Sequence, residues 1–368
     1  MRKDWEYKKW ADVLTIINGK NQKAVESIDG TYPIYGSGGI MGYANDWLCP
    51  ENCTIIGRKG NINKPIFVES KFWNVDTAFG LNSNQNLLAS KYLYYFCLNY
   101  DFNRHNKAVT IPSLTKVDLL KIEMPLPPKP TQLAIVAELD KINELIQLKK
   151  QQLKDYDQLA QSIFYEMFGD PVENEKGWEV KKLGEICDIR DGTHDSPKYV
   201  EHSDYLLITS KNIENNFISF ENVNYITEED FLRINKRSKV DDGDIIMPMI
   251  GTIGNPIIVK LVNNINFAIK NVALIKFYST SSVINYYLQS LMKSSSFEKD
   301  ITRFHKGGTQ KFIALGTIRN FKIPLPPLPL QQQFAARIEA IERQKQQVSE
   351  TIKDLETLLA SRMQYWFD

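Results

Sequence analysis

The sequence predicts an α+β protein of two modules with mixed α/β cores, each followed by one long helix. Three observations lead to this prediction: a repeated proline motif, a long heptad-like pattern after each copy, and short β-branched runs around glycine turns. The motif Met124-Pro125-Leu126-Pro127-Pro128 recurs as Ile323-Pro324-Leu325-Pro326-Pro327, an offset of 199 that aligns the following segments without a gap. A repeat of this length indicates two modules rather than a short-period solenoid.

Apolar residues follow each proline motif at alternating steps of three and four. This spacing, with charged residues between, is typical of a coiled-coil seam, and at 1.5 Å per residue each helix would extend roughly 55 Å. The alternative, two unrelated amphipathic helices buried in separate cores, is disfavoured because both copies keep one register. The predicted seam residues are Ile135, Leu139, Ile142, Ile146, Leu153 and Tyr156 in the first helix, and Phe334, Ile338, Ile341, Val348, Ile352 and Leu355 in the second.

The duplication continues into the modules. Trp5 to Lys9 recurs as Trp178 to Lys182, and the offset grows from 173 there to 199 at the prolines. The second module therefore carries 26 extra residues, most of them between Thr193 and Asp242. The predicted segments are 1–128 for the first module, 129–170 for its helix, 171–327 for the second module and 328–368 for its helix.

Short β-branched runs on either side of a glycine turn predict one hairpin in each module. Asn63 stands where the second module has Gly254, and we expect it to adopt a left-handed backbone conformation. An apolar helix before each proline motif is expected to use its tyrosines for core packing rather than base stacking. The hairpin runs are 54–57 with 66–68 and 245–250 with 257–259, and the helices lie near 93–98 and 286–291.

Composition excludes several classes of protein. A hydrophobic content of 43% is ordinary for a folded chain, and a net charge of +1 gives no sign of a strongly basic nucleic-acid binder. No apolar run approaches the ~18 residues of a membrane span and the start resembles no signal peptide, so we expect a cytoplasmic protein that contacts no membrane. The four cysteines lack zinc-like spacing, and no metal site is predicted.

Motifs for catalysis are absent. The sequence contains no G-x-x-x-x-G-K-[ST] phosphate loop and no Asn-Pro-Pro-aromatic motif of the methyltransferase type. The segment Gly36 to Gly42 matches a nucleotide fingerprint only loosely, because Met41 stands where its third glycine belongs, and we interpret it as a turn. The histidines and carboxylates show no catalytic spacing, so no catalytic residue is predicted.

The order of these features resembles that of the specificity (S) subunits of type I restriction-modification enzymes. The resemblance rests on a variable module, a P-L-P-P motif and a glutamine-containing long helix, all occurring twice, and it covers essentially the whole chain. Further motifs that carry it are Trp178 to Ile186, Asp191-Gly192-Thr193-His194, Gly243-Asp244-Ile245-Ile246, Gly251-Thr252-Ile253-Gly254 and Gly308-Thr309-Gln310.

The resemblance implies two target-recognition domains that each read half of a bipartite double-stranded DNA sequence. The long helices would pack antiparallel, relate the halves by a pseudo-twofold repeat, and hold them about one DNA turn apart, roughly 34 to 36 Å. It also implies that two modification (M) subunits dock on the helices and methylate adenine with S-adenosylmethionine, and that restriction (R) subunits add ATP- and Mg-dependent cleavage. The chain itself would then be non-catalytic and hold no cofactor.

DNA recognition needs side chains that hold phosphates and side chains that read base edges. The stretch Lys306 to Lys311 offers both, whereas the first module lacks its Gly-Thr-Gln triplet, so the target is expected to be asymmetric. For each candidate, a solvated surface charge is the alternative. The candidates are Arg58, Lys59, Arg104, Lys107 and Thr110 in the first module, and His194, Lys211, Asn212, Thr252, Lys306, Thr309, Gln310 and Lys311 in the second.

Two other functions remain open. One is an inactive or silent scaffold of the same architecture that binds the M subunit without reading DNA. The other is a self-contained enzyme, which the missing motifs disfavour. Co-purification of partners distinguishes the subunit from the enzyme, and sequence-dependent DNA binding distinguishes it from the scaffold.

Overall fold

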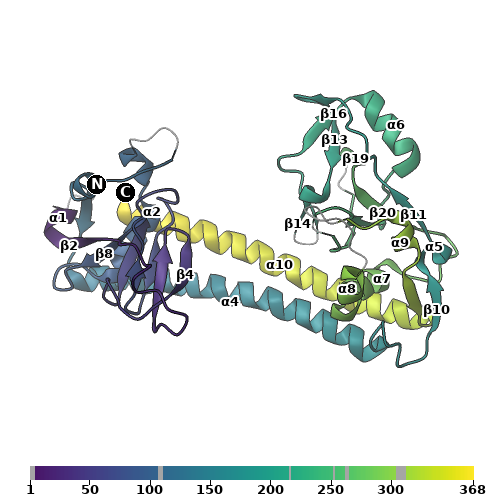
Figure 1. The fold of residues 1–368 in the computed structure, drawn as a ribbon, viewed down its shortest axis with the longest axis horizontal. Coiled ribbons are helices and arrows are strands. Elements are labelled where there is room, and N and C mark those ends of the chain that lie inside the picture. The colour runs from purple at the N-terminus through teal and green to yellow at the C-terminus, as the bar shows by residue number, and fades with distance from the viewer. Residues whose placement is uncertain (1–4, 107–110, 215–216, 252, 262–264, 304–311) are drawn as a thin grey trace. The chain divides into compact units, whose positions relative to one another are not determined.

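The computed structural model describes residues 5–106, 111–214, 217–251, 253–261, 265–303 and 312–368. The chain divides into two compact units (Figure 1), which we describe one at a time. Unit 1 comprises Met1–Gln152 together with Val348–Asp368, and unit 2 comprises Leu153–Gln347. Both combine helices with small sheets, which confirms the predicted α+β class.

Unit 1 is built on a four-stranded antiparallel sheet and a smaller three-stranded sheet. Its strands are β1 (Glu6–Lys9), β2 (Leu14–Asn18), β3 (Tyr32–Gly36), β4 (Gly39–Ala44), β5 (Cys53–Gly57), β6 (Ile66–Val68), β7 (Trp73–Asn74), β8 (Ala78–Ser83) and β9 (Glu123–Leu126). Its shorter helices are α1 (Trp10–Val13), α2 (Ser90–Asn99), the 3-10 helix η1 (Phe102–His105) and α3 (Lys116–Leu119). The sheet orders are β2-β8-β5-β6 and β4-β3-β7, and β1 pairs with β9.

Unit 2 repeats this plan with an insertion. Its strands are β10 (Glu179–Lys182), β11 (Cys187–Asp191), β12 (Tyr199–Val200), β13 (Tyr205–Ile208), β14 (Ile213–Glu214), β15 (Phe217–Ile218), β16 (Asn224–Ile226), β17 (Ile245–Pro248), β18 (Ile257–Ile258), β19 (Asn266–Ile269), β20 (Val272–Phe277) and β21 (Lys322–Leu325). Its shorter helices are α5 (Leu183–Ile186), η2 (Ser210–Asn212), α6 (Glu228–Ser238), α7 (Asn285–Met292), α8 (Ser295–Thr302) and α9 (Leu315–Arg319).

The two units match strand by strand. The sheet β11-β20-β17-β18 corresponds to β2-β8-β5-β6, and the parallel pair of β13 with β19 corresponds to β3 with β7. The predicted hairpins are confirmed as β5–β6 and β17–β18. β16, which pairs antiparallel with β13, corresponds to β4, which pairs antiparallel with β3. The additional elements of the second module are β12, β14, β15 and α6, and all of them lie within the predicted range.

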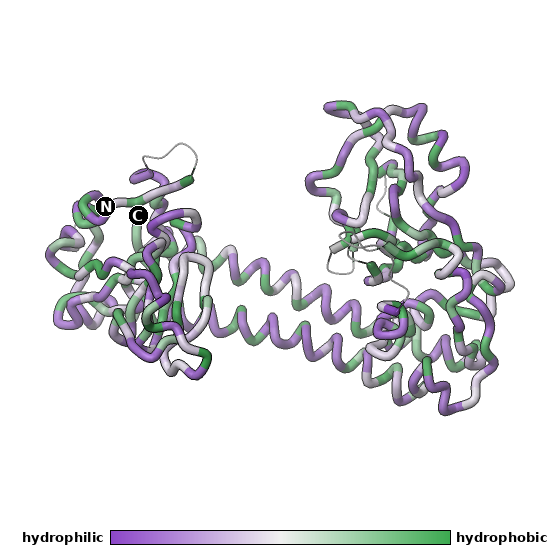
Figure 2. Tube along the Cα trace, in the orientation of Figure 1, coloured by the Kyte–Doolittle hydropathy of each residue, from purple (hydrophilic) through white to green (hydrophobic). Residues whose placement is uncertain are grey.

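Two 40-residue helices, α4 (Lys129–Phe168) and α10 (Leu328–Phe367), each run from one unit into the other. In unit 1 the first half of α4 lies beside the last half of α10, as the ion pair of Glu138 with Arg362 shows. In unit 2 the order is reversed, and Lys345 pairs with Asp157 at 2.7 Å. The helices are therefore antiparallel, and apolar and polar positions alternate along both (Figure 2).

All the predicted seam residues are buried or half-buried, but they serve two purposes. Ile135 and Leu139 belong to the core of unit 1, and Phe334 and Ile338 belong to the core of unit 2. The sequence-based division, which treats the helices as separate segments, therefore differs from the compact units, because the helix ends turn their apolar faces to the modules. None of the described helices has the length and apolar character needed to cross a membrane.

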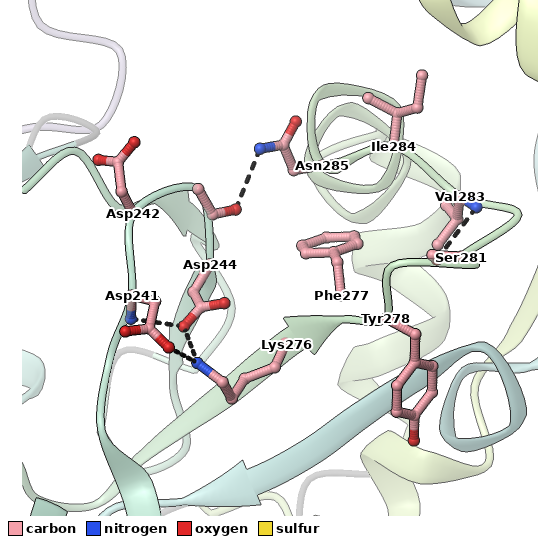
Figure 3. A pocket seen from close by; sticks show the side chains of 11 residues that line it. Asp241, Asp242, Asp244, Lys276, Phe277, Tyr278, Ser281, Val283, Ile284 and Asn285 are labelled. Atoms are coloured by element: carbon pink, nitrogen blue, oxygen red, sulfur yellow. Dashed lines mark hydrogen bonds and ion pairs between the residues drawn. The ribbon is translucent and has the colours of Figure 1, made fainter.

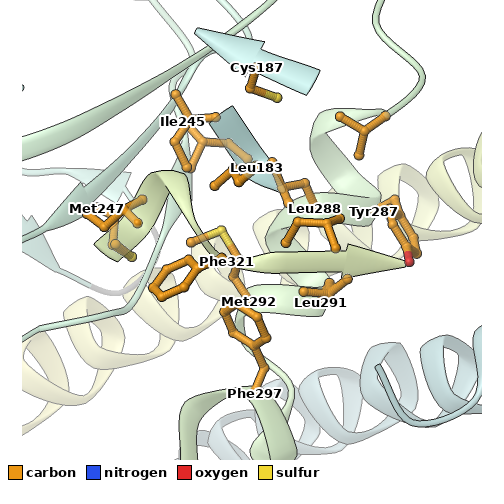
Figure 4. Packing of buried hydrophobic residues seen from close by; sticks show 14 of the residues in the cluster. Leu183, Cys187, Ile245, Met247, Tyr287, Leu288, Leu291, Met292, Phe297 and Phe321 are labelled. Atoms are coloured by element: carbon orange, nitrogen blue, oxygen red, sulfur yellow. The ribbon is translucent and has the colours of Figure 1, made fainter. Parts of the chain in front are cut away.

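The core of unit 2 shows how the helix ends are used (Figure 4). Its α7 contributes the buried Tyr287 and Leu288, which lie among residues of β17 and α5. The ring of Phe168, from the end of α4, packs edge-on against that of Tyr287, with 4.7 Å between the ring centroids. It also packs edge-on against the ring of Phe334 from α10, with 5.2 Å between the centroids. Aromatic packing of this kind adds about 0.5 to 1.5 kcal/mol per pair beyond burial.

A fully buried glutamine fixes the start of each long helix. Gln132 accepts a hydrogen bond from the backbone N–H of Ala89 at 2.8 Å and donates to the carbonyls of Leu87 and Pro127, both at 2.9 Å. Gln331 makes the equivalent three bonds in unit 2. These are the glutamines of the repeat. Each one connects its long helix to the proline motif and to the segment just before α2 or α7.

Replacing Gln331 with alanine should lower the free energy of unfolding of unit 2 by about 2 to 4 kcal/mol, measured by chemical denaturation. The substitution removes the partner of the buried carbonyl of Pro326 and of two half-buried groups, the N–H of Ile284 and the carbonyl of Ser282. The neighbouring Gln332 is exposed, so Gln332→Ala is the matched control and should change stability by less than about 0.5 kcal/mol. Equal effects of the two substitutions would contradict this role.

Candidate nucleic-acid interface

Several loops of unit 1 meet at one end of its four-stranded sheet. β2 and β5 both run antiparallel to β8, so the segments that leave them lie beside the segment that enters β8. The backbone N–H of Gly19 donates to the carbonyl of Ala78 at 3.2 Å, and that of Arg58 to Thr77 at 2.8 Å. The N–H of Leu114 donates to the carbonyl of Arg58 at 2.9 Å, so the segment before α3 joins the same end.

Unit 2 has the same end of sheet. Three backbone N–H groups donate to backbone carbonyls here. They are Gly192 to Val272 at 2.9 Å, Met249 to Asn271 at 3.3 Å, and Ile313 to Met249 at 2.9 Å. We call these two loop clusters sheet end 1 and sheet end 2. They share a backbone but differ in side chains, because Arg58 of sheet end 1 corresponds to Met249 of sheet end 2.

A glycine makes each of these loop clusters possible. A Cβ atom on Gly192 would lie 2.3 Å from the backbone oxygen of Ile269, and one on Gly19 would lie 1.8 Å from that of Val75. No other residue type allows the loop to approach the neighbouring strand this closely.

Sheet end 1 carries two of the predicted DNA-binding residues. Arg58 and Lys59 follow β5, and both are exposed. The guanidinium carbon of Arg58 lies 5.8 Å from the ring centre of Phe79, and the backbone of Lys59 bridges to Ser113. Two further candidates of this unit, Lys107 and Thr110, lie outside the described residues.

Arg104 reaches the same region through η1. The prediction of a left-handed Asn63 is wrong, because Asn63 has no positive φ, unlike Gly254 at φ 93°. Instead, its side chain donates to the carboxylate of Asp101 at 2.9 Å and accepts from the backbone N–H of Phe102 at 2.8 Å. These bonds tie η1, and with it the exposed Arg104, to the loop that follows β5.

Sheet end 2 carries His194 in a network of polar groups. The ring nitrogen Nε2 of His194 lies 2.8 Å from Oδ2 of Asp191, and Nδ1 lies 2.9 Å from Oδ1 of Asn271. The bonds to Asn271 and Asp191 raise the pKa of His194 above its ordinary value. The remaining candidates of this unit, apart from Lys211 and Asn212, lie outside the described residues; they are Thr252, Lys306, Thr309, Gln310 and Lys311.

Lys211 and Asn212 also lie near sheet end 2 but have different surroundings. Their helix η2 follows β13, whose last residue Ile208 accepts the backbone N–H of Lys270 at 2.9 Å. Lys211 is exposed. Asn212 is only 6% exposed, and its Oδ1 accepts from both the N–H and the hydroxyl of Thr209 at 3.0 Å. The expectation of a base-contacting Asn212 therefore does not match its position, because its carbonyl oxygen caps the turn.

Sequence reasoning missed two residues of sheet end 2. Arg237 at the end of α6 reaches Asp191 with its guanidinium at 3.0 Å and the carbonyl of Gly192 at 3.2 Å. Asn271 holds a left-handed conformation with φ 56°. The polar Lys270-Asn271 pair between two β-branched runs was a turn signal, but nothing local in the sequence pointed to Arg237.

A pocket of unit 2 is lined by side chains that pair with one another (Figure 3). Lys276 bridges the carboxylates of Asp241 at 2.8 Å and Asp244 at 2.5 Å, and Asn285 donates to the carbonyl of Gly243 at 3.0 Å. Burial raises the pKa of Asp244. These charges satisfy one another, and no group of His, Cys, Asp and Glu among the described residues is arranged to hold a metal ion.

Comparison with known proteins gives one consistent result. The family model described as "Type I restriction modification DNA specificity domain" matches residues 2–155 and 175–357. The MjaVIII specificity subunit of a type I restriction enzyme from Methanocaldococcus jannaschii is 25% identical, over 97% of this chain and 92% of that protein. The EcoBI specificity subunit from Escherichia coli is 21% identical, over 85% of this chain and 71% of that protein.

The fold also matches solved structures. The crystal structure of an S subunit from M. genitalium superposes with a TM-score of 0.58 at 14% identity, covering 100% of this chain and 98% of that one. A structure from a study of complex assembly in a type I system gives a TM-score of 0.56 at 17% identity, covering 99% and 97%. At these identities the similarity establishes the fold.

The neighbours Lys211 and Asn212 provide a test of the interface. Lys211→Ala should weaken binding to duplex DNA of any sequence and lower the salt dependence of binding by about one ion, with stability unchanged within about 0.5 kcal/mol. Asn212→Ala should instead destabilise unit 2 by about 1 kcal/mol, because it removes a cap. Salt-dependent fluorescence binding and thermal denaturation measure the two effects. If Lys211→Ala leaves the salt slope unchanged, Lys211 contacts no phosphate.

Proposed function

The chain belongs to the type I restriction-modification DNA specificity family, and on this premise we propose that it selects the DNA target of such an enzyme and catalyses no reaction itself. Each unit would read one half of a bipartite, asymmetric double-stranded sequence. The observation that carries the proposal is the duplicated sheet end, one backbone arrangement that presents different exposed side chains in each copy. A backbone shared by the two units, with different side chains on their loops, suits two readings of different bases.

The chemistry would belong to partner subunits. We propose that two methyltransferase (M) subunits dock on this chain and methylate adenine with S-adenosylmethionine, and that restriction (R) subunits bring ATP- and Mg-dependent cleavage. This division is supported by the family membership. It also fits the exposed polar surfaces of α4 and α10, where the seam leaves many charged residues facing outward.

Deleting this gene should remove one asymmetric, gapped methyladenine motif from the host genome. Mapping methylated adenine with and without the gene measures this and identifies both half-sites at once. Restoring the gene on a plasmid should restore the motif, which controls for loss of the partners. If methylation is unchanged although the M subunits co-purify with the chain, the protein is a silent scaffold that binds them without reading DNA.

The helices would set the gap between the half-sites. Four residues inserted into both α4 and α10 at the boundary between the units, after Gln152 and after Gln347, lengthen each by about 6 Å. The methylated motif should then change its spacer or disappear, while the half-sites keep their bases. The matched control inserts four residues after Glu175, in the exposed turn between α4 and β10. This insertion opens the turn in which Asn174 bonds Trp178, but it should leave the spacer of the methylated motif unchanged. An unchanged spacer with full methylation in the helix variant would exclude the helices as the ruler.

A further inference from the structure

Sheet end 2 contains a polar cluster that the sequence did not predict as a whole. The carboxylate of Asp191 accepts from His194 at 2.8 Å and from Arg237 at 3.0 Å. His194 in turn lies 2.9 Å from the side-chain oxygen of Asn271. The side chain of His194 is 55% exposed and that of Arg237 is 62% exposed, whereas Asp191 is 16% exposed. The cluster is therefore organised around a shielded carboxylate and turns its donors to the surface.

The chemistry of the groups fixes their protons. A carboxylate only accepts, so Nε2 of His194 carries the hydrogen that faces Asp191. The other nitrogen, Nδ1, faces the oxygen of Asn271 and must also carry a hydrogen for that contact to be a bond. This arrangement requires the doubly protonated ring, and the raised pKa of His194 favours it. Both N–H groups of His194 are then used inside the protein.

The hydrogen on Nδ1 and the orientation of the Asn271 amide go together, because a ring nitrogen without hydrogen would pair with the amide N–H instead of its oxygen. With its oxygen held by His194, the amide presents its two N–H donors away from the histidine. The only side-chain bond of Asn271 within the described part of the chain is the one to His194, and its backbone is held separately by Thr193 and Met249. His194 therefore decides which end of the Asn271 amide is offered at the sheet end.

We propose that Asn271 donates a hydrogen bond to an acceptor on DNA, and that His194 is the positioning residue that keeps the donor end of its amide outward. This inference rests on the proposed function and deepens it, because it names a contact in the second half-site. The acceptor is either a base edge, such as purine N7, or a phosphate oxygen, and Arg237 stands beside it as a second donor.

Loss of the ring proton reverses the arrangement. When His194 is neutral, the bond to Asp191 keeps the one ring hydrogen on Nε2. Nδ1 then has no hydrogen and faces the oxygen of Asn271, so the lone pairs of the two atoms repel. A rotation of the amide restores a hydrogen bond but turns its oxygen outward, where it can only accept. The charged groups that face His194 are Asp191 from β11, which favours the proton, and Arg237 from α6, which opposes it. Lys270, in the same turn as Asn271, bonds Ser196 instead.

Unit 1 contains an internal control. Gly19 and Gly192 occupy the same place in the two sheet ends, as do Thr77 and Asn271. In this register the positions of Asp191 and His194 are taken by Asn18 and Asn21. Sheet end 1 therefore has no histidine at the position of His194, and the reading of the first half-site should not depend on pH in this way.

The test selects DNA from a pool of duplexes with randomised bases, using the full-length protein purified in its native complex, at about pH 6 and about pH 8.5. The pKa of His194 is raised above the ordinary histidine value of about 6.5, so the ring is protonated at the lower pH, and the higher pH lies well above that ordinary value. Asn271→Asp keeps an acceptor for His194 but removes the donors, and Asn271→Gly removes the amide while tolerating the left-handed backbone. Asn222→Gly is the control, because Asn222 has the same left-handed backbone (φ 53°) as the half-buried Asn271 but is itself exposed. His194→Gln removes the titrating ring.

At pH 6 the wild-type protein should prefer one base at a position of the second half-site by roughly 5- to 100-fold, and lose this preference at pH 8.5. Both Asn271 variants should lack the preference at either pH, His194→Gln should remove its pH dependence, and the control and the first half-site should be unaffected. A phosphate contact gives a different pattern, in which the Asn271 variants weaken binding to all sequences and lower the salt slope by about one ion.

Two results would overturn the inference while the proposed function stands, and a third would contradict the proposed function itself. If the wild type selects both half-sites but neither Asn271 variant changes preference, affinity or salt slope, Asn271 contacts no DNA and the proposed function stands. If the Asn271 variants act but His194→Gln keeps the wild-type pH response, His194 is not the positioning residue. If the wild type selects no sequence at either pH, the proposed function itself fails.

Discussion

Two helices that each have to satisfy two cores are the constraint on which the rest of the structure depends. Leu139 near the start of α4 and Phe367 at the end of α10 are buried in unit 1, whereas Phe164 and Phe334 are buried in unit 2. Neither module encloses its core without these helix ends. The buried glutamines follow from this, because a helix shared by two cores must enter each at a fixed place and angle. Three directed hydrogen bonds at each helix start supply that placement in a way that apolar contacts alone do not.

The backbone of each sheet end is independent of the side chains that its loops present. The sheet ends keep their backbone, with Gly60 and Gly251 both at φ 78° after the central strand, although the flanking side chains differ. Burial and close backbone approach leave little freedom at Gly19 and Gly192, and none of that restriction extends to the exposed loop positions. The molecule can therefore change what it contacts without changing how it folds, which is the property that a recognition subunit needs.

Local patterns predicted much of this fold, and long-range contacts account for what they missed. The helix ranges, the two hairpins and the core role of Tyr287 follow from periodicity and turn residues within short windows. The division into units does not, because Phe367 packs against residues far away in sequence. Of the candidate DNA-binding residues, Arg58 and Lys59 lie at sheet end 1, and His194 and Lys211 lie at or near sheet end 2. Burial of Asn212 and the partnership of His194 with Asn271 depend on strand pairing that no local pattern reveals.

The composition of unit 1 has a consequence for how the protein is made. Its core closes only when Val348–Asp368 arrives, and the indole of Trp5 stacks on that of Trp366 with ring centroids 6.1 Å apart. At about 5 to 20 residues per second, a ribosome delivers that segment on the order of tens of seconds after the first strands. The first module thus waits, with apolar surface uncovered, while unit 2 can form from one continuous stretch. A stop codon just before Val348 would therefore disrupt unit 1, most of which is synthesised first, rather than unit 2.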